Sequence, residues 1–293
     1  MKKLLTILIV VALFAVTFVG CAPKAETPEQ PSGQAEPQQG TEAAPEETFD
    51  ISSLRLTFVT PYGAHPYWMK AEDGVLAAAK DLGVDVDMTG PTELNLDEQL
   101  RAIETAIASR VDGILTNGYV PEAFNPIFER AHEAGIPVVL IDADSPESTR
   151  ICYIGTSNYE AGFTAGKAMI ELTGGSAKIG ILTGPLDSVN LNERIDGFKD
   201  AIKDQPNMEI LATEVTDADL LKATEKAQTM LQAYPEMNAI FGVSGNDIVG
   251  AGTIVEEKGL VGQITLIGFD DLDQTLDFIR KGVVTATTVQ RPY

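Results

Sequence analysis

Histidine, cysteine and tryptophan are scarce in this sequence of 293 residues, which has two histidines, two cysteines and one tryptophan. The histidines are His65 and His132, and neither is grouped with cysteine at the spacing of zinc ligands. One of the two cysteines, Cys21, lies in an N-terminal targeting segment, which excludes a framework of disulfides. We therefore expect no metal site, no cofactor and no disulfide-stabilised fold.

Basic residues are also few, since 21 lysines and arginines face 43 aspartates and glutamates and give a net charge of −22. A chain this acidic is a poor nucleic-acid binder, because phosphate binding needs clustered Lys and Arg. The sequence also has no P-loop, no G-x-S-x-G and no G-x-G-x-x-G after its first expected strand, which disfavours the enzyme classes that use these motifs. Cys152 lies in the apolar run 151–154, and we interpret it as a buried core cysteine rather than a nucleophile.

The N-terminus combines two lysines with an apolar run over residues 4–19. A transmembrane helix needs about 20 apolar residues, so this shorter run fits a secretory signal peptide over residues 1–20 better. The run ends in Phe-Val-Gly-Cys, which resembles a bacterial lipoprotein box and implies that Cys21 receives the lipid. Such a lipid would hold the protein at a membrane surface without spanning the membrane. The alternative is an uncleaved amphiphilic anchor.

Residues 21–50 are rich in Pro, Glu, Gln, Ala and Gly and contain few large apolar side chains. Such a segment cannot bury enough apolar surface to offset the entropy of ordering. We predict a disordered tether that lets the remaining chain diffuse near the membrane.

From residue 51 onward, short β-branched runs alternate with helical patterns every 25–30 residues or so, which predicts parallel sheets covered by helices on both faces. The expected strands are 54–59, 84–88, 112–115, 136–141, 177–182, 208–213, 238–241, 264–267 and 283–287, and the expected helices are 66–81, 96–109, 121–134, 157–172, 190–203, 217–233, 246–258 and 271–280. Asn95 with Glu98, and Ser157 with Glu160, are spaced as capping boxes. Gly83 follows a helical run, as C-terminal caps do.

The α/β pattern begins again after about residue 156, across a short polar link. We predict two similar doubly wound, Rossmann-like α/β domains joined by a hinge, with a first lobe over 51–156 and a second over 157–288.

Ligands of open parallel sheets bind outside the carboxyl ends of the strands, so the residues that follow each strand are the candidates for a binding site. They comprise His65, Tyr67, Trp68, Asn117 and Asp142 in the first lobe and Asn192, Ser244, Asn246, Asp270 and Gln290 in the second. Aromatic faces pack on the C–H face of a sugar ring, and carboxylate and amide groups bind its hydroxyls, so this set suits a neutral polyhydroxylated ligand. Taken singly, the aromatic residues could equally be core residues, and the aspartates could be turn or helix caps.

Several short segments in order resemble the type I periplasmic binding proteins, in particular the branch that binds ribose and galactose. The carrying motifs are Pro66-Tyr67-Trp68, Val111-Asp112-Gly113-Ile114-Leu115-Thr116-Asn117, Gly135-Ile136-Pro137-Val138-Val139-Leu140-Ile141-Asp142, Glu193-Arg194-Ile195-Asp196-Gly197-Phe198, Asn238-Ala239-Ile240-Phe241, Ile267-Gly268-Phe269-Asp270 and Thr285-Ala286-Thr287-Thr288-Val289-Gln290. The resemblance covers roughly residues 54–293 and implies two α/β lobes that close on a sugar. It also implies a return crossing over 289–293, with the lobes moving about crossings near Ser157 and Val289.

By this resemblance, Tyr67 and Trp68 would enclose the sugar ring, and the polar candidates would bind its hydroxyls. Ala143 and Asn192 stand where arginines are typical of ribose binders, so we do not predict ribose itself. Anionic ligands are disfavoured, because Asp142 and Asp270 would face them with few cations nearby. Family members also continue past the segment at which this sequence stops, so we expect an incomplete chain whose first lobe lacks closing elements.

The resemblance implies a non-enzymatic solute-binding component of an ABC importer, located outside the cytoplasm in the periplasm or at the cell surface. Its expected partners are a monosaccharide-like ligand, the permease of the transporter and, through the lipid alone, the membrane; we expect a monomer and no nucleic acid. The alternatives are a protein that presents its ligand to a membrane receptor kinase, or a binder of nucleosides or other small polar ligands. A transcriptional regulator is disfavoured, because no basic helix-turn-helix segment is present.

Overall fold

The computed structural model describes residues 50–293, so the predicted signal peptide, the lipidation site at Cys21 and almost all of the predicted tether lie outside the described residues. After a short 3-10 turn (Ile51–Ser53), the chain forms β1 (Arg55–Val59), α1 (Pro66–Leu82), β2 (Asp85–Thr89), α2 (Leu96–Ala108), β3 (Gly113–Thr116), α3 (Pro121–Glu133), β4 (Val138–Ile141) and β5 (Cys152–Ile154). We call this part the first lobe.

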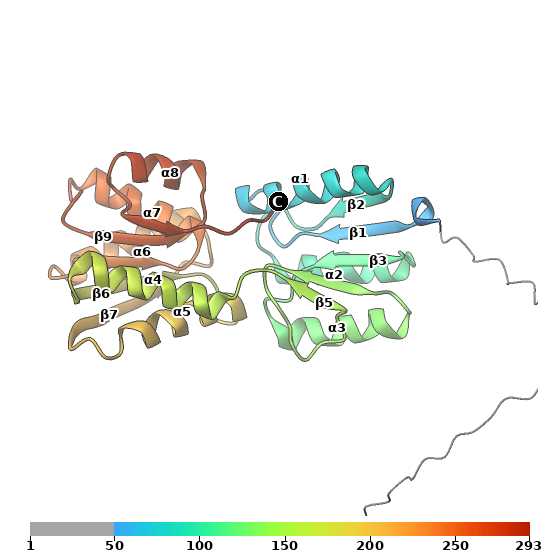
Figure 1. Ribbon diagram of the computed structural model, residues 1–293, viewed down its shortest axis with the longest axis horizontal. Coiled ribbons are helices and arrows are strands. Elements are labelled where there is room, and N and C mark those ends of the chain that lie inside the picture. Colours follow the sequence, from blue (N-terminus) through green and yellow to red (C-terminus); the bar gives the residue numbers. More distant parts are fainter. Residues whose placement is uncertain (1–49) are drawn as a thin grey trace, which may run out of the picture. The chain divides into compact units, whose positions relative to one another are not determined.

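The second lobe follows with α4 (Asn158–Thr173), β6 (Ser176–Thr183), α5 (Val189–Ile202), β7 (Asn207–Val215), α6 (Leu220–Ala233), β8 (Ala239–Gly242), α7 (Gly245–Glu257), β9 (Thr265–Phe269), α8 (Asp273–Arg280) and β10 (Ala286–Thr288). Each lobe has one five-stranded sheet (Figure 1), in the orders β2-β1-β3-β4-β5 and β7-β6-β8-β9-β10. Every strand pair is parallel. The predicted fold class, two doubly wound parallel α/β sheets, is confirmed.

The two faces of the first sheet bury different helices, because successive strand residues point to opposite sides. On one face, α2 and α3 cover Val59, Ile114 and Leu140 and form a core that includes Phe124 and Phe128. On the other face, α1 packs Trp68 and Ala71 against Phe58, with the partly buried Leu115 and Ile141 beside them.

That second face also has an apolar groove of about 630 Å³. Its walls include Val75 and Leu82 of α1, Val86 of β2 and the C-terminal Tyr293. Leu82 is 60% exposed, so apolar surface remains open to solvent here.

The second sheet is covered on both faces. Helices α4 and α5 pack on one face around Phe198, Phe241 and Phe269, and α6, α7 and α8 pack on the other. The α4–α5 contact is backbone to backbone: a Cβ added to Gly162 would lie 1.9 Å from the carbonyl oxygen of Arg194. Glycine is therefore required where these helices cross.

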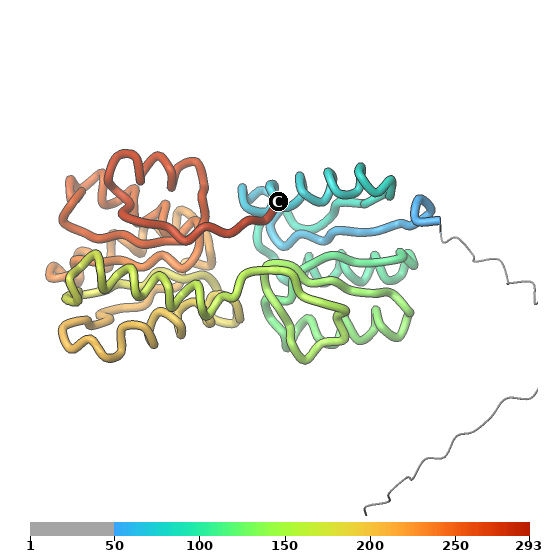
Figure 2. Tube along the Cα trace, in the orientation of Figure 1, coloured from blue at the N-terminus to red at the C-terminus, as the bar shows by residue number. Residues whose placement is uncertain are grey.

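The chain leaves the first lobe after β5 and turns back toward it after β10, as the tube in Figure 2 shows. The two crossing segments are hydrogen-bonded to each other, since the Thr156 hydroxyl donates to the Gln290 side-chain carbonyl at 2.8 Å. Within residues 50–293, no helix has the length and apolar character needed to span a membrane.

Most predicted helix boundaries agree with the structure to within a few residues, and the caps explain why. Asn95 accepts a hydrogen bond from the Glu98 N–H, and Gly83 ends α1 in the left-handed conformation with φ of 71°. The predicted capping box at Ser157 is wrong, because the Ser157 side chain makes no capping hydrogen bond. The prediction of a buried Cys152 is also wrong: β5 is an edge strand, and the cysteine is exposed.

Candidate functional site

The candidate site is a pocket between the two lobes, at the carboxyl ends of both sheets. Its lining consists of Pro61, Tyr62, His65, Tyr67, Trp68, Leu94, Asn117, Tyr119, Asp142, Pro185, Ser188, Asn190, Leu191, Arg194, Ala218, Ser244, Gly245, Asp270 and Gln290. The cavity volume is about 100 Å³. By this measure one water occupies roughly 10–15 Å³, so the pocket holds a ligand of small size. The larger apolar groove on α1 lacks such a concentration of polar groups.

The pocket brings together eight predicted residues: His65, Tyr67, Trp68, Asn117, Asp142, Ser244, Asp270 and Gln290. The other two lie outside its lining. Asn192 turns away and donates to the Leu186 carbonyl at 2.7 Å, and Asn246 donates to the Ala218 carbonyl at 2.8 Å. Both amides instead hold loops that border the pocket.

The start of α1 places the aromatic side of the site. His65 is the N-cap of α1, and its Nδ1 accepts a hydrogen bond from the Tyr67 N–H at 3.2 Å, which leaves the imidazole proton on Nε2. Burial lowers the pKa of His65 although Asp270 opposes the shift, so the ring is neutral. Trp68 packs against Phe58 with ring centroids 6.4 Å apart while it also lines the pocket. Trp68 is therefore both a core residue and a lining residue of the pocket.

Asp142 and Asp270 occupy equivalent positions in the two lobes. Asp142 directly follows β4 and Asp270 directly follows β9, and each of these strands lies beside the edge strand of its sheet. Both residues have a left-handed backbone, with φ of 64° and 68°. Their N–H groups donate to the neighbouring edge strand, at Ile154 in the first lobe and Thr288 in the second. The same local turn thus points a carboxylate into the pocket from both sides.

The environment of Asp142 is electrostatically unusual. Burial raises the pKa of Asp142 to about 6, while Arg194 and the Tyr67 hydroxyl oppose the shift. Tyr67 is affected in the same way, since burial and the nearby Asp142 and Asp270 raise the pKa of its phenol. The pocket therefore has ionisable groups whose charged forms are poorly solvated until a ligand supplies hydrogen bonds.

Arg194 of α5 is a pocket residue that the sequence interpretation missed. It is 2% exposed, its Nε donates to Asn158 at 2.9 Å, one terminal nitrogen donates to the Val243 carbonyl at 3.0 Å, and its guanidinium lies 4.2 Å from the Phe269 ring centroid. The other terminal nitrogen has no partner in the protein. Asn192 stands where an arginine is typical of ribose binders, but the same helix places Arg194 in the pocket lining.

The spacing of apolar residues could have revealed Arg194. Leu191, Ile195 and Phe198 form the buried stripe of α5, and Arg194 lies on it, three residues after Leu191 and four before Phe198. Asn192 lies about 200° away from Arg194 around the helix, outside that stripe.

Amide side chains orient several pocket groups. Gln99, fully buried on α2, donates to the Asn117 side-chain oxygen at 2.7 Å, which leaves the Asn117 amide N–H groups to face the pocket. Asn190 donates to Asp142 across the lobes at 3.4 Å. Gln290 accepts from Thr156 and donates to Asp270 at 2.9 Å, so the two crossing segments also fix a pocket carboxylate.

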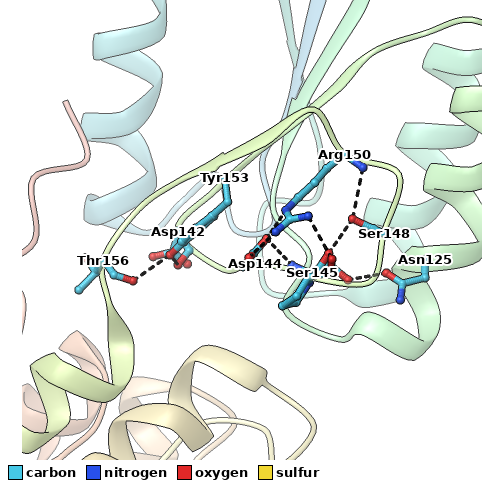
Figure 3. Close-up of polar contacts among 9 residues, drawn as sticks. Asn125, Asp142, Asp144, Ser145, Ser148, Arg150, Tyr153 and Thr156 are labelled. Atoms are coloured by element: carbon cyan, nitrogen blue, oxygen red, sulfur yellow. Dashed lines mark hydrogen bonds and ion pairs between the residues drawn. The ribbon is translucent and has the colours of Figure 1, made fainter. Parts of the chain in front are cut away.

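The loop after β4 holds Asp142 in place through a set of polar contacts, shown in Figure 3. Arg150 binds Asp144 with two nitrogens, at 2.5 and 2.8 Å, and closes the loop. The Tyr153 hydroxyl bridges the carbonyl groups of Asp142 and Thr156, at 2.8 and 3.0 Å. The loop is thereby tied to the first crossing segment.

The two lobes also contact each other directly near the pocket. The Val189 N–H donates to the Tyr119 carbonyl at 2.8 Å, and Lys70 of α1 lies 2.8 Å from Asp271 in the second lobe. Among the described residues, no group of three or more His, Cys, Asp or Glu side chains is placed to hold a metal ion.

Comparison with known proteins agrees with this geometry. Residues 56–293 match the family described as periplasmic binding protein domain. GanP, a glucose-galactose binding protein from Geobacillus stearothermophilus, superposes with a TM-score of 0.80 at 40% identity over 82% of this chain and 86% of that one. A solute-binding protein from Burkholderia graminis in complex with D-arabinose gives a TM-score of 0.79 at 32% identity, over 83% and 85% of the two chains.

A curated relative in sequence is the D-ribose/D-allose-binding protein of Pseudomonas aeruginosa, 26% identical over 80% of this chain and 76% of its own length. The ribose import binding protein of Bacillus subtilis is 25% identical over 100% of this chain and 89% of its own. Since the family match spans both sheets and the pocket between them, the chain belongs to the periplasmic binding protein domain family.

Proposed function

We propose that this protein is the extracytoplasmic sugar-binding component of an ABC importer, and that its ligand is a neutral monosaccharide held in the interlobe pocket. The observation that supports this most directly is the pairing of Asp142 and Asp270 on opposite sides of a small pocket that also contains aromatic rings. Buried carboxylates accept hydrogen bonds from adjacent hydroxyls, and aromatic faces cover the C–H face of a sugar ring.

The charge balance of the pocket favours a neutral ligand. Two carboxylates face one guanidinium, so an anionic ligand would be repelled, whereas sugar hydroxyls can donate to the carboxylates and accept from the free Arg194 nitrogen. The relatives described above support the same class of ligand, since they are a glucose-galactose binding protein, a solute-binding protein in complex with D-arabinose and a D-ribose/D-allose-binding protein.

The mechanism is hinge closure without chemical change. Sugar contacts both lobes only when they are closed, so it stabilises the closed form by this difference in contacts. The crossing segments that contain Thr156 and Gln290 allow the motion, and the permease recognises the closed form. Members of this family are non-enzymatic transport components, and the pocket residues have binding roles only.

Binding can be tested by isothermal titration calorimetry and thermal shift with D-glucose, D-galactose, D-arabinose, D-ribose and D-allose, with a nucleoside and a sugar phosphate as controls. At 100 times its dissociation constant, a ligand should stabilise the protein by about 2.7 kcal/mol. Asp142→Ala and Asp270→Ala should each abolish the shift. If the folded protein binds none of the sugars, the proposal is wrong.

The N-terminal sequence supports lipid attachment at Cys21 after removal of residues 1–20. Mass spectrometry of the protein isolated from membranes should find a diacylated N-terminal cysteine, and Cys21→Ser should release the protein from the membrane fraction. Recovery of the wild-type chain with residues 1–20 intact would contradict this proposal. The protein acts as a monomer, which sedimentation velocity tests.

A role in sensing is the second candidate. The observation that favours it is a structural neighbour, XylFII, which was solved in complex with a second protein, LytSN. XylFII is 36% identical to this chain, with a TM-score of 0.79 over 82% of it. Deletion of the gene separates the two functions: an import component is needed for uptake of labelled sugar, whereas a sensing component is needed for sugar-induced transcription.

A further inference from the structure

Behind the second-lobe wall of the pocket lies a buried carboxylate that the proposed sugar site does not include. Asp247, in the first turn of α7, is 0% exposed and does not line the pocket. Its Oδ2 accepts from both the N–H and the hydroxyl of Ser244, at 2.9 and 2.7 Å. Its Oδ1 accepts from the Thr216 hydroxyl at 2.5 Å.

These three residues join two parts of the pocket wall. Ser244 lines the pocket and is only partly buried, whereas Asp247 and Thr216 are fully buried behind it. Thr216 in turn accepts a hydrogen bond from the N–H of Ala218, another pocket residue, at 3.1 Å. Ala218 has a positive φ of 55°, so its backbone needs such a restraint.

The network determines which kind of hydrogen bond Ser244 can offer. A serine hydroxyl has one proton and two acceptor lone pairs. Here the proton is used by Asp247, and Oδ2 also receives the Ser244 backbone N–H, so this oxygen acts as an acceptor toward both groups. The Ser244 oxygen also accepts from the Asp247 backbone N–H, as in a capping box, so toward the pocket the hydroxyl has only its remaining lone pair to offer.

We propose that Asp247 is a positioning residue for sugar selection, an inference that rests on the proposed function. Asp247 fixes Ser244 as a group that only accepts hydrogen bonds, and Ser244 then selects a ligand hydroxyl that donates. Asp247 does not touch the ligand. Together with Asp142 and Asp270, which also accept, Ser244 then favours ligands rich in hydroxyl donors, and the Arg194 guanidinium is the main charged donor of the pocket.

The test uses the full-length wild-type protein with the tightest binder among the five sugars of the panel above, together with its complete sets of monodeoxy and monodeoxyfluoro analogues. Fluorine at carbon can accept weakly but cannot donate. At the position that faces Ser244, the fluoro analogue should therefore bind as weakly as the deoxy analogue, about two- to tenfold weaker than the parent sugar. In Ser244→Ala, the deoxy analogue at this position and the parent sugar should bind with equal affinity. Deoxy analogues at the positions that face Asp142 and Asp270 should still bind more weakly than the parent, so the variant identifies the hydroxyl that Ser244 contacts.

Variants of Asp247 then test the positioning role. In Asp247→Ala the Ser244 hydroxyl proton no longer binds a carboxylate and can donate to the ligand. The fluoro analogue at that position should therefore regain at least half of the affinity that it lost relative to the parent sugar. Asp247→Asn should keep the wild-type pattern, because its amide oxygen can accept both Ser244 bonds while its N–H group donates to Thr216. Glu256→Gln removes a charge from the opposite end of α7 and serves as the control.

The position that faces Ser244 is the one whose deoxy analogue loses affinity in the wild type but not in Ser244→Ala. If the fluoro analogue at this position binds the wild type as tightly as the parent sugar does, the inference is overturned, because Ser244 would then act as a donor. An unchanged analogue pattern in folded Asp247→Ala would overturn it as well. If Asp247→Ala does not fold, Thr216→Val and the wild-type analogue series still decide whether Ser244 acts toward the ligand as an acceptor or as a donor. If the folded wild type binds none of the five sugars, the proposed function fails, and this inference fails with it. If binding is retained without the analogue pattern, the inference alone is rejected.

Discussion

The ammonium group of Lys70 lies 2.8 Å from a carboxylate oxygen of Asp271 and joins α1 of the first lobe to the segment after β9 in the second. Neither residue lines the candidate pocket. The pair can form only when the lobes are close together, so it favours the closed form whether or not a ligand is bound.

Lys70→Gln should weaken sugar binding slightly. Both side chains are about 40% exposed, and ion pairs of this kind contribute up to about 1 kcal/mol, so the dissociation constant should rise by no more than about fivefold. Calorimetry at low and high salt should show that the difference from wild type shrinks as salt increases. Lys281→Gln, which breaks pairs confined to the second lobe, should leave the affinity unchanged. Tighter binding by Lys70→Gln would contradict this account.

Arg194→Lys should reduce both stability and affinity, although the charge is kept. Lysine cannot reproduce the fork that binds Asn158 and the Val243 carbonyl, nor the planar contact with Phe269. Hydrogen bonds to charged groups contribute roughly 1.5–3 kcal/mol, so a loss of several kcal/mol of unfolding free energy is expected in chemical denaturation. A variant with wild-type stability would show that the buried fork is not needed. Lys199→Arg, on the same helix but exposed, is the control.

Stability without ligand should depend on pH through Asp142. Its pKa is raised from 3.8 to about 6 in the folded protein, so the folded state binds more protons than the unfolded state between these values. The contribution of the group is fully present below about pH 3.8 and is lost as the pH rises through 6, by roughly 3 kcal/mol. Asp142→Asn does not titrate, so its melting temperature relative to wild type should increase between pH 4 and pH 7. A difference independent of pH would disprove the shift.

Sugar affinity should show the opposite trend with pH. Ligand hydroxyls donate to the ionised Asp142, so binding favours the carboxylate and lowers its pKa in the complex. The affinity should therefore increase from pH 5 to pH 7, with protons released on binding. Calorimetry in two buffers of different ionisation enthalpy measures that release. Uptake of protons at pH 6 would contradict the prediction.

Gly162→Ala should destabilise the second lobe and impair the site together. Its new Cβ would lie 1.9 Å from the Arg194 carbonyl oxygen, so α4 and α5 would have to separate, and Arg194 would move with α5. Overpacking of this kind typically costs about 1–3 kcal/mol. Gly63→Ala, whose Cβ meets nothing closer than 3.5 Å, is a control for stability in urea denaturation. Equal stability of the two variants would show that the crossing tolerates a side chain.

The fold could be predicted because both lobes repeat a simple period. β-branched runs and amphipathic helices alternate, and caps such as Gly83 mark where helices end, so the elements and the fold class followed from local sequence. The exposure of the edge strand β5 could not be predicted. The residues around Cys152 are apolar enough for a core, yet β5 lies at the end of its sheet and is largely exposed.

Pocket-lining residues that directly follow strands could be predicted from the sequence, whereas those that lie within helices were harder to predict. Asp142 and Asp270 were found because strand ends converge at one edge of a sheet. Arg194 was missed, since the expected cation position was aligned with Asn192, on another face of α5. Asn246 was expected to face the pocket, but α7 already begins at Gly245, and the amide therefore binds the Ala218 loop instead.

The left-handed backbone shared by Asp142 and Asp270 restricts how these positions can evolve. Few residues tolerate this conformation, and glycine, the one that adopts it most readily, has no side chain to bind a ligand. Asparagine is the one common replacement that satisfies the backbone and still offers an oxygen and a donor. Drift toward other sugars within this lineage is therefore expected to proceed by exchange between aspartate and asparagine at these two turns, and by wider variation in the helices around them.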